Sequence, residues 1–114
     1  MVNKWEIYFC DLSPVVGSEQ KGKRPVLIVS SDAINHHLTV STVLPLSSFK
    51  VGERVYASEV LLGAKETGLS KDSIAMVYQI RTLSHDRFLN RAGMISDELQ
   101  RNKIEEAMRD YFEL

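Results

Sequence analysis

Three cations gather in one stretch of this sequence, DLSPVVGSEQKGKRPVLIVSSD at residues 11–32. Lys21, Lys23 and Arg24 follow a polar segment and stand directly before an apolar run. The proline and glycines of the polar segment already allow the chain to reverse, so the turn itself needs no cations. A guanidinium presents fixed, forked donors to a phosphate, and lysines add positive charge beside it. The stretch therefore indicates a local anion-binding site, with an ordinary solvated surface loop as the alternative.

Other catalytic chemistries lack a motif in this chain. Neither HExxH nor a CxxC cluster occurs, and Cys10 is the single cysteine. His36, His37 and His85 are scattered, so no metal or other cofactor is expected. The phosphate cradles GxGxxG and GxxxxGK[ST] are absent, and none of the numerous serines stands in a GxSxG nucleophile elbow. The cationic stretch is what remains to carry chemistry.

Length and composition are those of a single globular domain spanning residues 1–114, with 44% hydrophobic and 25% charged residues. The formal net charge of -1 excludes a broad basic surface, so a polyanionic partner would have to bind locally. One cysteine fits a reducing compartment, and the opening MVNKWEIYF is unlike a signal peptide. No apolar run is long enough to cross a membrane. We therefore expect a cytoplasmic protein without a membrane anchor.

Apolar patterning predicts the elements that position the cations. Five strands are expected, at residues 4–10, 25–30, 38–46, 54–62 and 73–81. The first alternates Trp5, Ile7 and Phe9 with other residues, as a half-buried strand does. The second is short, branched and apolar, which is typical of a strand buried on both faces. Pro45 cannot donate to a ladder and favours an edge position or a bulge in the third strand.

Helical patterns follow the strands. Ser84 is expected to cap a short helix over residues 85–89, and Ser96 a longer helix with acidic residues in its first turn. The longer helix carries one apolar stripe, formed by Ile104, Ala107, Met108, Tyr111 and Phe112. This order predicts a mainly β chain, an antiparallel curled sheet or small barrel with the C-terminal helix packed on it.

The segments DLSPVVGSEQ and GKRPVLIVSSD, the QIRT at residues 79–82 and the residues from Ser96 to Leu99 together resemble the MazF/PemK family of bacterial toxins. The resemblance covers nearly the whole chain. It implies an SH3-like small antiparallel barrel of five to seven strands with a C-terminal helix, and no cofactor. It also implies a toxin that cleaves single-stranded RNA at preferred sequences without a metal ion. Such toxins work as homodimers and are silenced by a cognate antitoxin, MazE-like or similar.

The resemblance also points to candidate residues. Arg24, immediately before Pro25, matches the family's catalytic arginine, and Ser47 stands where the family places a threonine hydroxyl, with Ser48 as the alternative. The RNA path is expected to be lined by Ser18, Glu19, Gln20, Lys21 and Lys23. Glu19 is the one carboxylate in the loop that could act as a general base. RNA is cut without metal when its own 2′-hydroxyl attacks the adjacent phosphate, and an arginine can stabilise the charge that develops.

Two positions depart from the family pattern. The family commonly has Arg-Gly before an acidic residue at the first strand, whereas Lys4 and Trp5 precede Glu6 here. Trp5 is expected in the core, with stacking on an RNA base as the alternative. Many relatives carry an acidic residue where this chain has Tyr78, which removes a carboxylate from that position.

Two other functions fit the same fold. A gyrase-poisoning toxin like CcdB binds protein and cuts nothing, but that family relies on a Trp-Gly-Ile ending, and this chain ends Tyr-Phe-Glu-Leu. A non-catalytic module that binds RNA or protein is the third interpretation, and Tyr78 and Ser47 keep it open. Neither alternative predicts cleavage of RNA.

Overall fold

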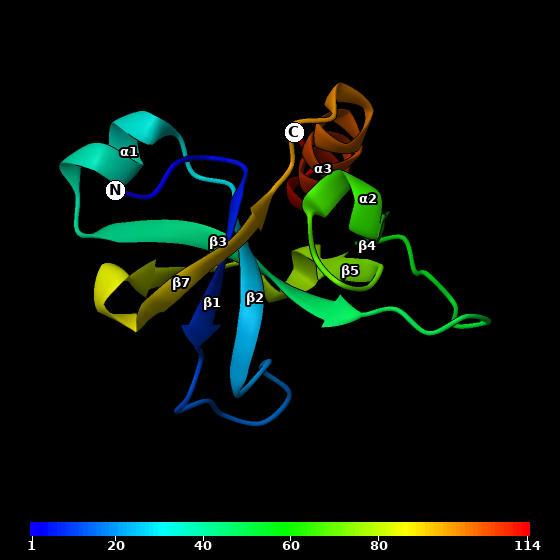
Figure 1. Cartoon of the computed structure of the whole chain (residues 1–114), viewed down its shortest axis with the longest axis horizontal. Coiled ribbons are helices and arrows are strands. Elements are labelled where there is room, and N and C mark those ends of the chain that lie inside the picture. The colour runs from blue at the N-terminus through cyan, green and yellow to red at the C-terminus, as the bar shows by residue number, and fades with distance from the viewer.

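Seven antiparallel strands carry the architecture, in a computed structural model that describes residues 1–114 (Figure 1). In chain order the elements are β1 (Glu6–Asp11), β2 (Lys23–Ile28), α1 (Asp32–His37), β3 (Val40–Ser48), β4 (Glu59–Leu62), α2 (Ala64–Thr67), β5 (Ser73–Met76), the 3-10 helix η1 (Val77–Gln79), β6 (Arg81–Ser84), the 3-10 helix η2 (His85–Arg87), β7 (Phe88–Met94) and α3 (Glu98–Phe112). The sheet order is β4-β5-β3-β2-β1-β7, with β6 paired to β3. The expected class, mainly β with a C-terminal helix, is confirmed. The barrel is not closed, because β4 and β7 each have one unpaired edge.

Two hydrophobic clusters pack against the central strands. The larger one includes side chains of α3 and contains Trp5, Ile7, Leu27, Val29, Leu44, Leu46, Val60, Leu62, Ala75, Val77, Ile95, Ile104 and Ala107. The smaller one contains Cys10, Leu12, Val26, Ile28, Val43 and Leu83. Successive residues of a strand point to opposite faces, so the consecutive apolar residues of β2 supply both clusters. The prediction that this strand is buried on both faces is confirmed.

β3 is a central strand, so the edge position expected from Pro45 is wrong. On one side, Pro45 pairs with Val26 of β2. On the other side, β3 pairs with β6 up to Val43 and with β5 from Leu46 onward. Pro45 thus lies where the strand changes partner, and its missing N–H is tolerated there. Through this change, β3 links the part of the sheet around β1 and β2 to the part formed by β4 and β5 (Figure 1).

The alternation predicted for the first strand does not hold, since Glu6 is buried to 8% exposure between Trp5 and Ile7. Ile7 is buried as expected, but Phe9 is 36% exposed and Cys10 is fully buried. The pairing of β1 with β7 shifts register on both sides of Tyr8. In addition, Leu12 follows β1 directly and joins Cys10 in the smaller cluster. Both faces of β1 are therefore partly apolar.

The prediction of a short helix over residues 85–89 is wrong. Ser84 does cap a turn, but the turn is the 3-10 helix η2, and the chain then continues as β7. β7 pairs with β1, and this long-range ladder outweighs the local helical signal. Gly93 permits the strand to lie here, because a Cβ at this position would be 2.2 Å from the carbonyl oxygen of Thr67.

Two predicted strands are longer than those observed. Only the end of the 54–62 segment forms a strand, β4, and the 73–81 segment divides into β5, η1 and the start of β6. The short helices α1 and α2 have no counterpart among the expected elements. α3 begins one residue later than expected, because the N-cap is Asp97 and not Ser96. The Asp97 carboxylate accepts the Gln100 N–H at 3.0 Å.

The apolar stripe of α3 is covered over its first half only. Ile104 and Ala107 are buried in the larger cluster, whereas Tyr111 and Phe112 remain 45% and 50% exposed. The two aromatic rings contact each other edge to face at the end of the helix. None of the helices, α3 included, has the length and apolar character needed to cross a membrane.

Trp5 is confirmed as a core residue, with 8% of its surface exposed. Its backbone N–H donates to the Ile28 carbonyl, and its own carbonyl accepts the Ile95 N–H at 2.8 Å. The φ angle of Trp5 is 76°, a left-handed conformation that favours glycine. The family that the sequence resembles commonly has glycine here, and the tryptophan keeps a backbone shape that glycine adopts more easily.

Candidate functional site

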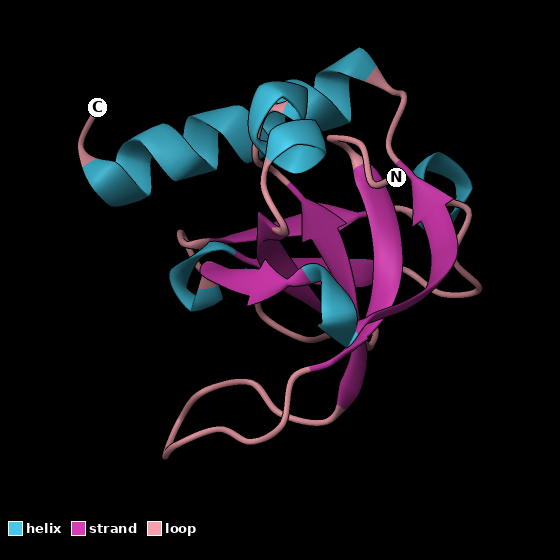
Figure 2. Ribbon diagram, turned by 90° about the vertical axis from the view of Figure 1, so that its left-hand side faces the viewer, coloured by secondary structure: helices cyan, strands magenta, loops and turns pink.

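The loop that joins β1 to β2, residues 12–22, lies at the end of the molecule away from α3 (Figures 1 and 2). The Leu12 N–H donates to the Gly22 carbonyl at 3.0 Å and closes the base of the loop. Gly17 and Gly22 have φ angles of 57° and 85°, which let the chain turn without strain. Most side chains between them are exposed. The hairpin therefore presents this loop to solvent.

Two arginines from distant segments hold the chain at the start of the loop, residues 11–13, through hydrogen bonds to its carbonyls. Arg81 of β6 donates Nη1 to the Leu12 carbonyl at 3.4 Å. Arg87 of η2 donates Nη1 to the carbonyls of Asp11 and Ser13 at 3.2 and 2.8 Å. Neither arginine is among the residues selected from the sequence, because nothing local relates them to the loop.

Gln79 of η1 holds the later part of the loop, at Ser18 and Gln20. Its Oε1 accepts the Gln20 N–H at 3.1 Å, and its Nε2 donates to the Ser18 carbonyl at 3.1 Å. The Gln20 side chain in turn donates Nε2 to Sδ of Met76 at 3.4 Å. The sequence shows Gln79 as the start of QIRT, but it offers no signal that the residue reaches this loop.

Glu19 belongs to the loop's own hydrogen-bond network. Its carboxylate accepts the Val16 N–H, and its backbone N–H donates to the Val16 carbonyl at 3.2 Å. The side chain proposed as a general base therefore stabilises a tight turn. Beside this turn, the Lys21 and Lys23 side chains are exposed and form no ion pair within the chain.

Arg24 is half-buried near the start of β2, where it pairs with Cys10 of β1. Its Nε donates to the Lys21 carbonyl at 2.8 Å, which fixes one edge of the guanidinium. The terminal nitrogens Nη1 and Nη2 make no hydrogen bond or ion pair within the chain. A guanidinium held in this way keeps its forked end available for an oxyanion.

Strand register separates Ser47 from Ser48. The β2–β3 pairing runs from Ile28 opposite Val43 to Val26 opposite Pro45. The ladder with β2 ends there, and Ser47 pairs with Ile74 of β5. Alternation along β2 and β3 puts the Arg24 and Ser47 side chains on the face of the smaller cluster.

Ser48 points to the other face. It lines a surface pocket of about 290 Å³ together with Phe9, Pro25 and Lys71. Alternation along β2 likewise turns Lys23 away from Arg24. The geometry therefore favours Ser47 as the hydroxyl on the arginine's face, and it places Lys23 to the side of the arginine site.

Residues 3–112 match the family model described as PemK-like, MazF-like toxin of type II toxin-antitoxin system. The chain belongs to this toxin family. It is 33% identical over 109 residues to Endoribonuclease EndoA of Bacillus subtilis (strain 168), which covers 96% of this chain and 92% of that protein. It is 35% identical over 119 residues to Endoribonuclease MazF9 of Mycobacterium tuberculosis, with 100% and 98% covered. A mycobacterial endoribonuclease solved in complex with its cognate antitoxin has the same fold, with a TM-score of 0.80 at 24% identity over 100% of this chain and 97% of that one.

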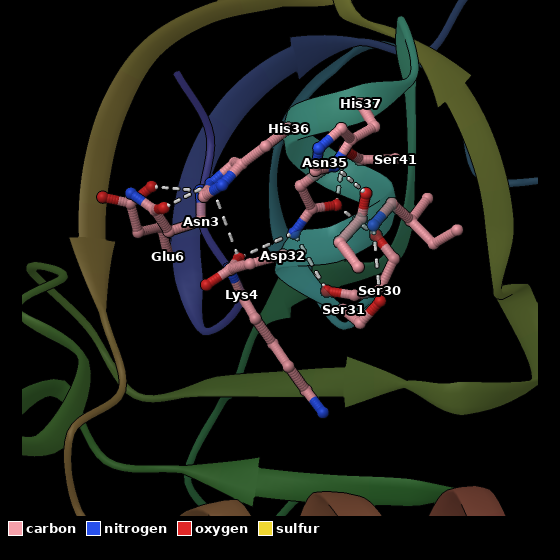
Figure 3. Close-up of polar contacts among 12 residues, drawn as sticks. Asn3, Lys4, Glu6, Ser30, Ser31, Asp32, Asn35, His36, His37 and Ser41 are labelled. Atoms are coloured by element: carbon pink, nitrogen blue, oxygen red, sulfur yellow. Dashed lines mark hydrogen bonds and ion pairs between the residues drawn. The ribbon is translucent and has the colours of Figure 1, made fainter.

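A second polar group of this MazF-like chain surrounds α1 (Figure 3). Asn35 is 2% exposed, and its Nδ2 donates to the Ser30 carbonyl and to Asp32 Oδ1. Asp32 also accepts the Lys4 N–H at 2.7 Å. This backbone hydrogen bond, with the Asn35 amide second, lowers the pKa of Asp32. His36 completes the group by contacting Asn3 at 2.7 Å, so these side chains fasten the N-terminal segment to α1.

Ser41 and His85 contact each other at 2.8 Å but do not form a nucleophile and base. The Ser41 hydroxyl donates its one proton to Asn35 Oδ1 at 2.8 Å, so His85 Nε2 acts as the donor in the other contact. A catalytic histidine would have to accept that proton instead. Ser41 is also fully buried, which keeps a substrate from reaching it.

The remaining reactive side chains do not favour another chemistry in this toxin fold. Burial raises the pKa of the Cys10 thiol to about 12, so the thiol stays protonated and unreactive. Burial, followed by the nearby Glu59 carboxylate, raises the pKa of Tyr78. No group of three or more histidine, cysteine, aspartate or glutamate side chains is placed to hold a metal ion.

Proposed function

We propose that this MazF-like toxin is an endoribonuclease that cleaves single-stranded RNA at preferred sequences without a metal ion. The observation that carries the proposal is the state of Arg24, whose Nε is anchored while Nη1 and Nη2 stay free beside the unpaired Lys21. This arrangement suits a phosphate of a chain molecule that lies across the loop. The relatives named EndoA and MazF9 support the reaction class.

In the proposed reaction, the RNA supplies its own nucleophile. The 2′-hydroxyl loses its proton and forms a bond to the adjacent phosphorus, and the bond from phosphorus to O5′ breaks as O5′ gains a proton. The products are a 2′,3′-cyclic phosphate and a 5′-hydroxyl. Arg24 stabilises the charge that develops on the phosphate oxygens, and the Ser47 hydroxyl orients the phosphate. Ser18, Gln20, Lys21 and Lys23 bind the flanking RNA, and Glu19 shapes the loop that carries them.

Purified protein is expected to cut a long single-stranded RNA in the presence of EDTA, because every group in the proposed reaction belongs to the RNA or to the protein. The measurement maps the cut sites and the chemistry of the new ends. Cyclic phosphate and 5′-hydroxyl ends at a small set of sequences are expected. A strict need for magnesium would remove the mechanism, and intact RNA would favour a non-catalytic binding module.

Ser47→Ala is expected to lower the rate of RNA cleavage by about tenfold to a hundredfold, since it removes a hydrogen bond to a charged phosphate. Ser48→Ala is the matched control, because the same hydroxyl is removed from the opposite face of β3. Its rate should stay within about twofold of the parent. The two rates are measured under single-turnover conditions, and a larger loss for Ser48→Ala would move the hydroxyl's role to that residue.

We also propose that residues 1–114 act as one toxin domain in the cytoplasm, paired as a homodimer and inhibited by a MazE-like or similar antitoxin. The half-exposed Tyr111 and Phe112 support pairing, because a single copy of the chain leaves them uncovered. The antitoxin complex of the mycobacterial relative supports inhibition by a cognate partner. Uninhibited cleavage of mRNA would stop translation and growth.

A further inference from the structure

We propose that Gln79 is the positioning residue of the RNA-binding loop, which it holds in place through both ends of its amide. Oε1 accepts the Gln20 N–H, and Nε2 donates to the Ser18 carbonyl, each at 3.1 Å. One side chain thus forms hydrogen bonds with both a backbone N–H and a backbone carbonyl on the same turn of the loop. The inference rests on the proposed function, because it assigns the fixed loop a role in RNA cleavage.

Gln79 makes the main hydrogen bonds between residues 14–20 of the loop and the rest of the protein. From Pro14 to Gln20 the loop closes its own turn, and every hydrogen bond that leaves the segment ends on Gln79 or Met76. The Met76 contact joins an amide to a thioether, which is a weak acceptor. Without the Gln79 amide, the contact with the Met76 thioether would be the one hydrogen bond left between this exposed segment and the rest of the protein.

The base from which Gln79 reaches the loop is rigid. Gln79 is the last residue of η1, and the Ile80 N–H closes this turn on the Val77 carbonyl at 3.0 Å. Val77 is fully buried in the larger cluster, and its N–H donates to the Ser58 carbonyl at 3.0 Å. A side chain that starts from a fixed turn can fix a mobile partner.

Gln79 acts on binding more than on the chemical step. Lys21, whose carbonyl anchors Arg24, is followed by Gly22, and Gly22 is held separately by the Leu12 N–H. The anchor of the guanidinium therefore survives loss of the Gln79 contacts. What is lost is the fixed position of Ser18 and Gln20, two of the residues proposed to bind flanking RNA. Free motion of these residues must be arrested when RNA binds, which weakens affinity.

The test compares Gln79→Ala and Gln79→Glu with the parent and with Asn90→Ala. Gln79→Glu keeps the size and the acceptor but cannot donate to the Ser18 carbonyl. Asn90 is an exposed amide of β7 whose side chain makes no hydrogen bond, so its variant controls for loss of a surface amide. Two quantities are measured: amide hydrogen exchange at Gln20, and single-turnover cleavage of a single-stranded RNA over a range of protein concentrations.

Gln79→Ala is expected to speed exchange at Gln20 and to raise the protein concentration for half-maximal cleavage by about tenfold, the effect of two lost neutral hydrogen bonds. Gln79→Glu still accepts the Gln20 N–H and loses only the bond to Ser18, so its half-saturating concentration should lie between those of the parent and Gln79→Ala. The rate at saturating protein should change by less than about threefold, and Asn90→Ala should match the parent. Unchanged exchange in Gln79→Ala would overturn the inference, and so would faster exchange in that variant with unchanged half-saturation. A parent protein that cuts no RNA would contradict the proposed function, and the exchange rates would still decide whether Gln79 holds the loop.

Discussion

Arg24→Lys is expected to lower the single-turnover rate of RNA cleavage at saturating protein by about a hundredfold to a thousandfold. The wild-type guanidinium uses Nε on the Lys21 carbonyl and leaves two terminal nitrogens for the phosphate. An ammonium keeps the charge but has no fork, so it cannot hold its anchor and grip two phosphate oxygens in a fixed geometry. Because the charge is conserved, RNA binding should suffer less than the rate.

Lys23→Ala is the control for this comparison. Lys23 precedes Arg24 at the start of β2, and alternation places its exposed side chain on the other face of the strand. Its loss should weaken affinity and reduce the salt dependence by about one phosphate contact, with the saturating rate nearly unchanged. Equal saturating rates for the parent, Arg24→Lys and Lys23→Ala would mean that Arg24 takes no part in the chemistry.

The candidate arginine can be selected from sequence because its signal is local. Arg24 stands between a polar turn and an apolar strand, and residue type alone says what a guanidinium can bind. The residues that hold the loop have no such signal. Gln79 and Arg87 reach it across 59 and 74 residues, and their contacts are to backbone atoms, which any sequence provides. Such contacts appear only when the fold is known.

In the fold, too, the elements with a local sequence signal are predictable, and those that depend on long-range contacts are not. β2 is predictable because its apolar run is buried whatever its partners are. β7 is missed because its sequence, FLNRAGM, lacks a strand pattern, and its structure depends on the ladder with β1. The role of Pro45 is misjudged for a related reason. A proline is excluded from a continuous ladder, but the sequence does not show that β3 changes partner at that residue.

Trp5→Ala is expected to lower the free energy of unfolding by about 3–5 kcal/mol, the range for removal of a buried aromatic side chain. Trp5 is 8% exposed and belongs to the larger cluster. Its ring centroid lies 5.1 Å from Lys4 Nζ and 5.4 Å from the Arg101 guanidinium carbon. Its loss removes apolar burial together with two cation–π contacts. Urea unfolding at one fixed protein concentration measures the change, since the proposed pairing would make the midpoint depend on concentration.

Trp5→Gly separates the side chain from the backbone. Glycine in place of alanine ordinarily costs about 0.5–1 kcal/mol through the entropy of the unfolded chain. At a φ of 76° the order should reverse, because alanine pays for the left-handed conformation and glycine does not. Trp5→Gly is therefore expected to be more stable than Trp5→Ala by about 1 kcal/mol, although both remain well below the parent. An alanine variant as stable as the glycine variant would show that the positive φ relaxes when the ring is removed. The tryptophan itself would then be what holds the backbone in a conformation that the family pattern assigns to glycine.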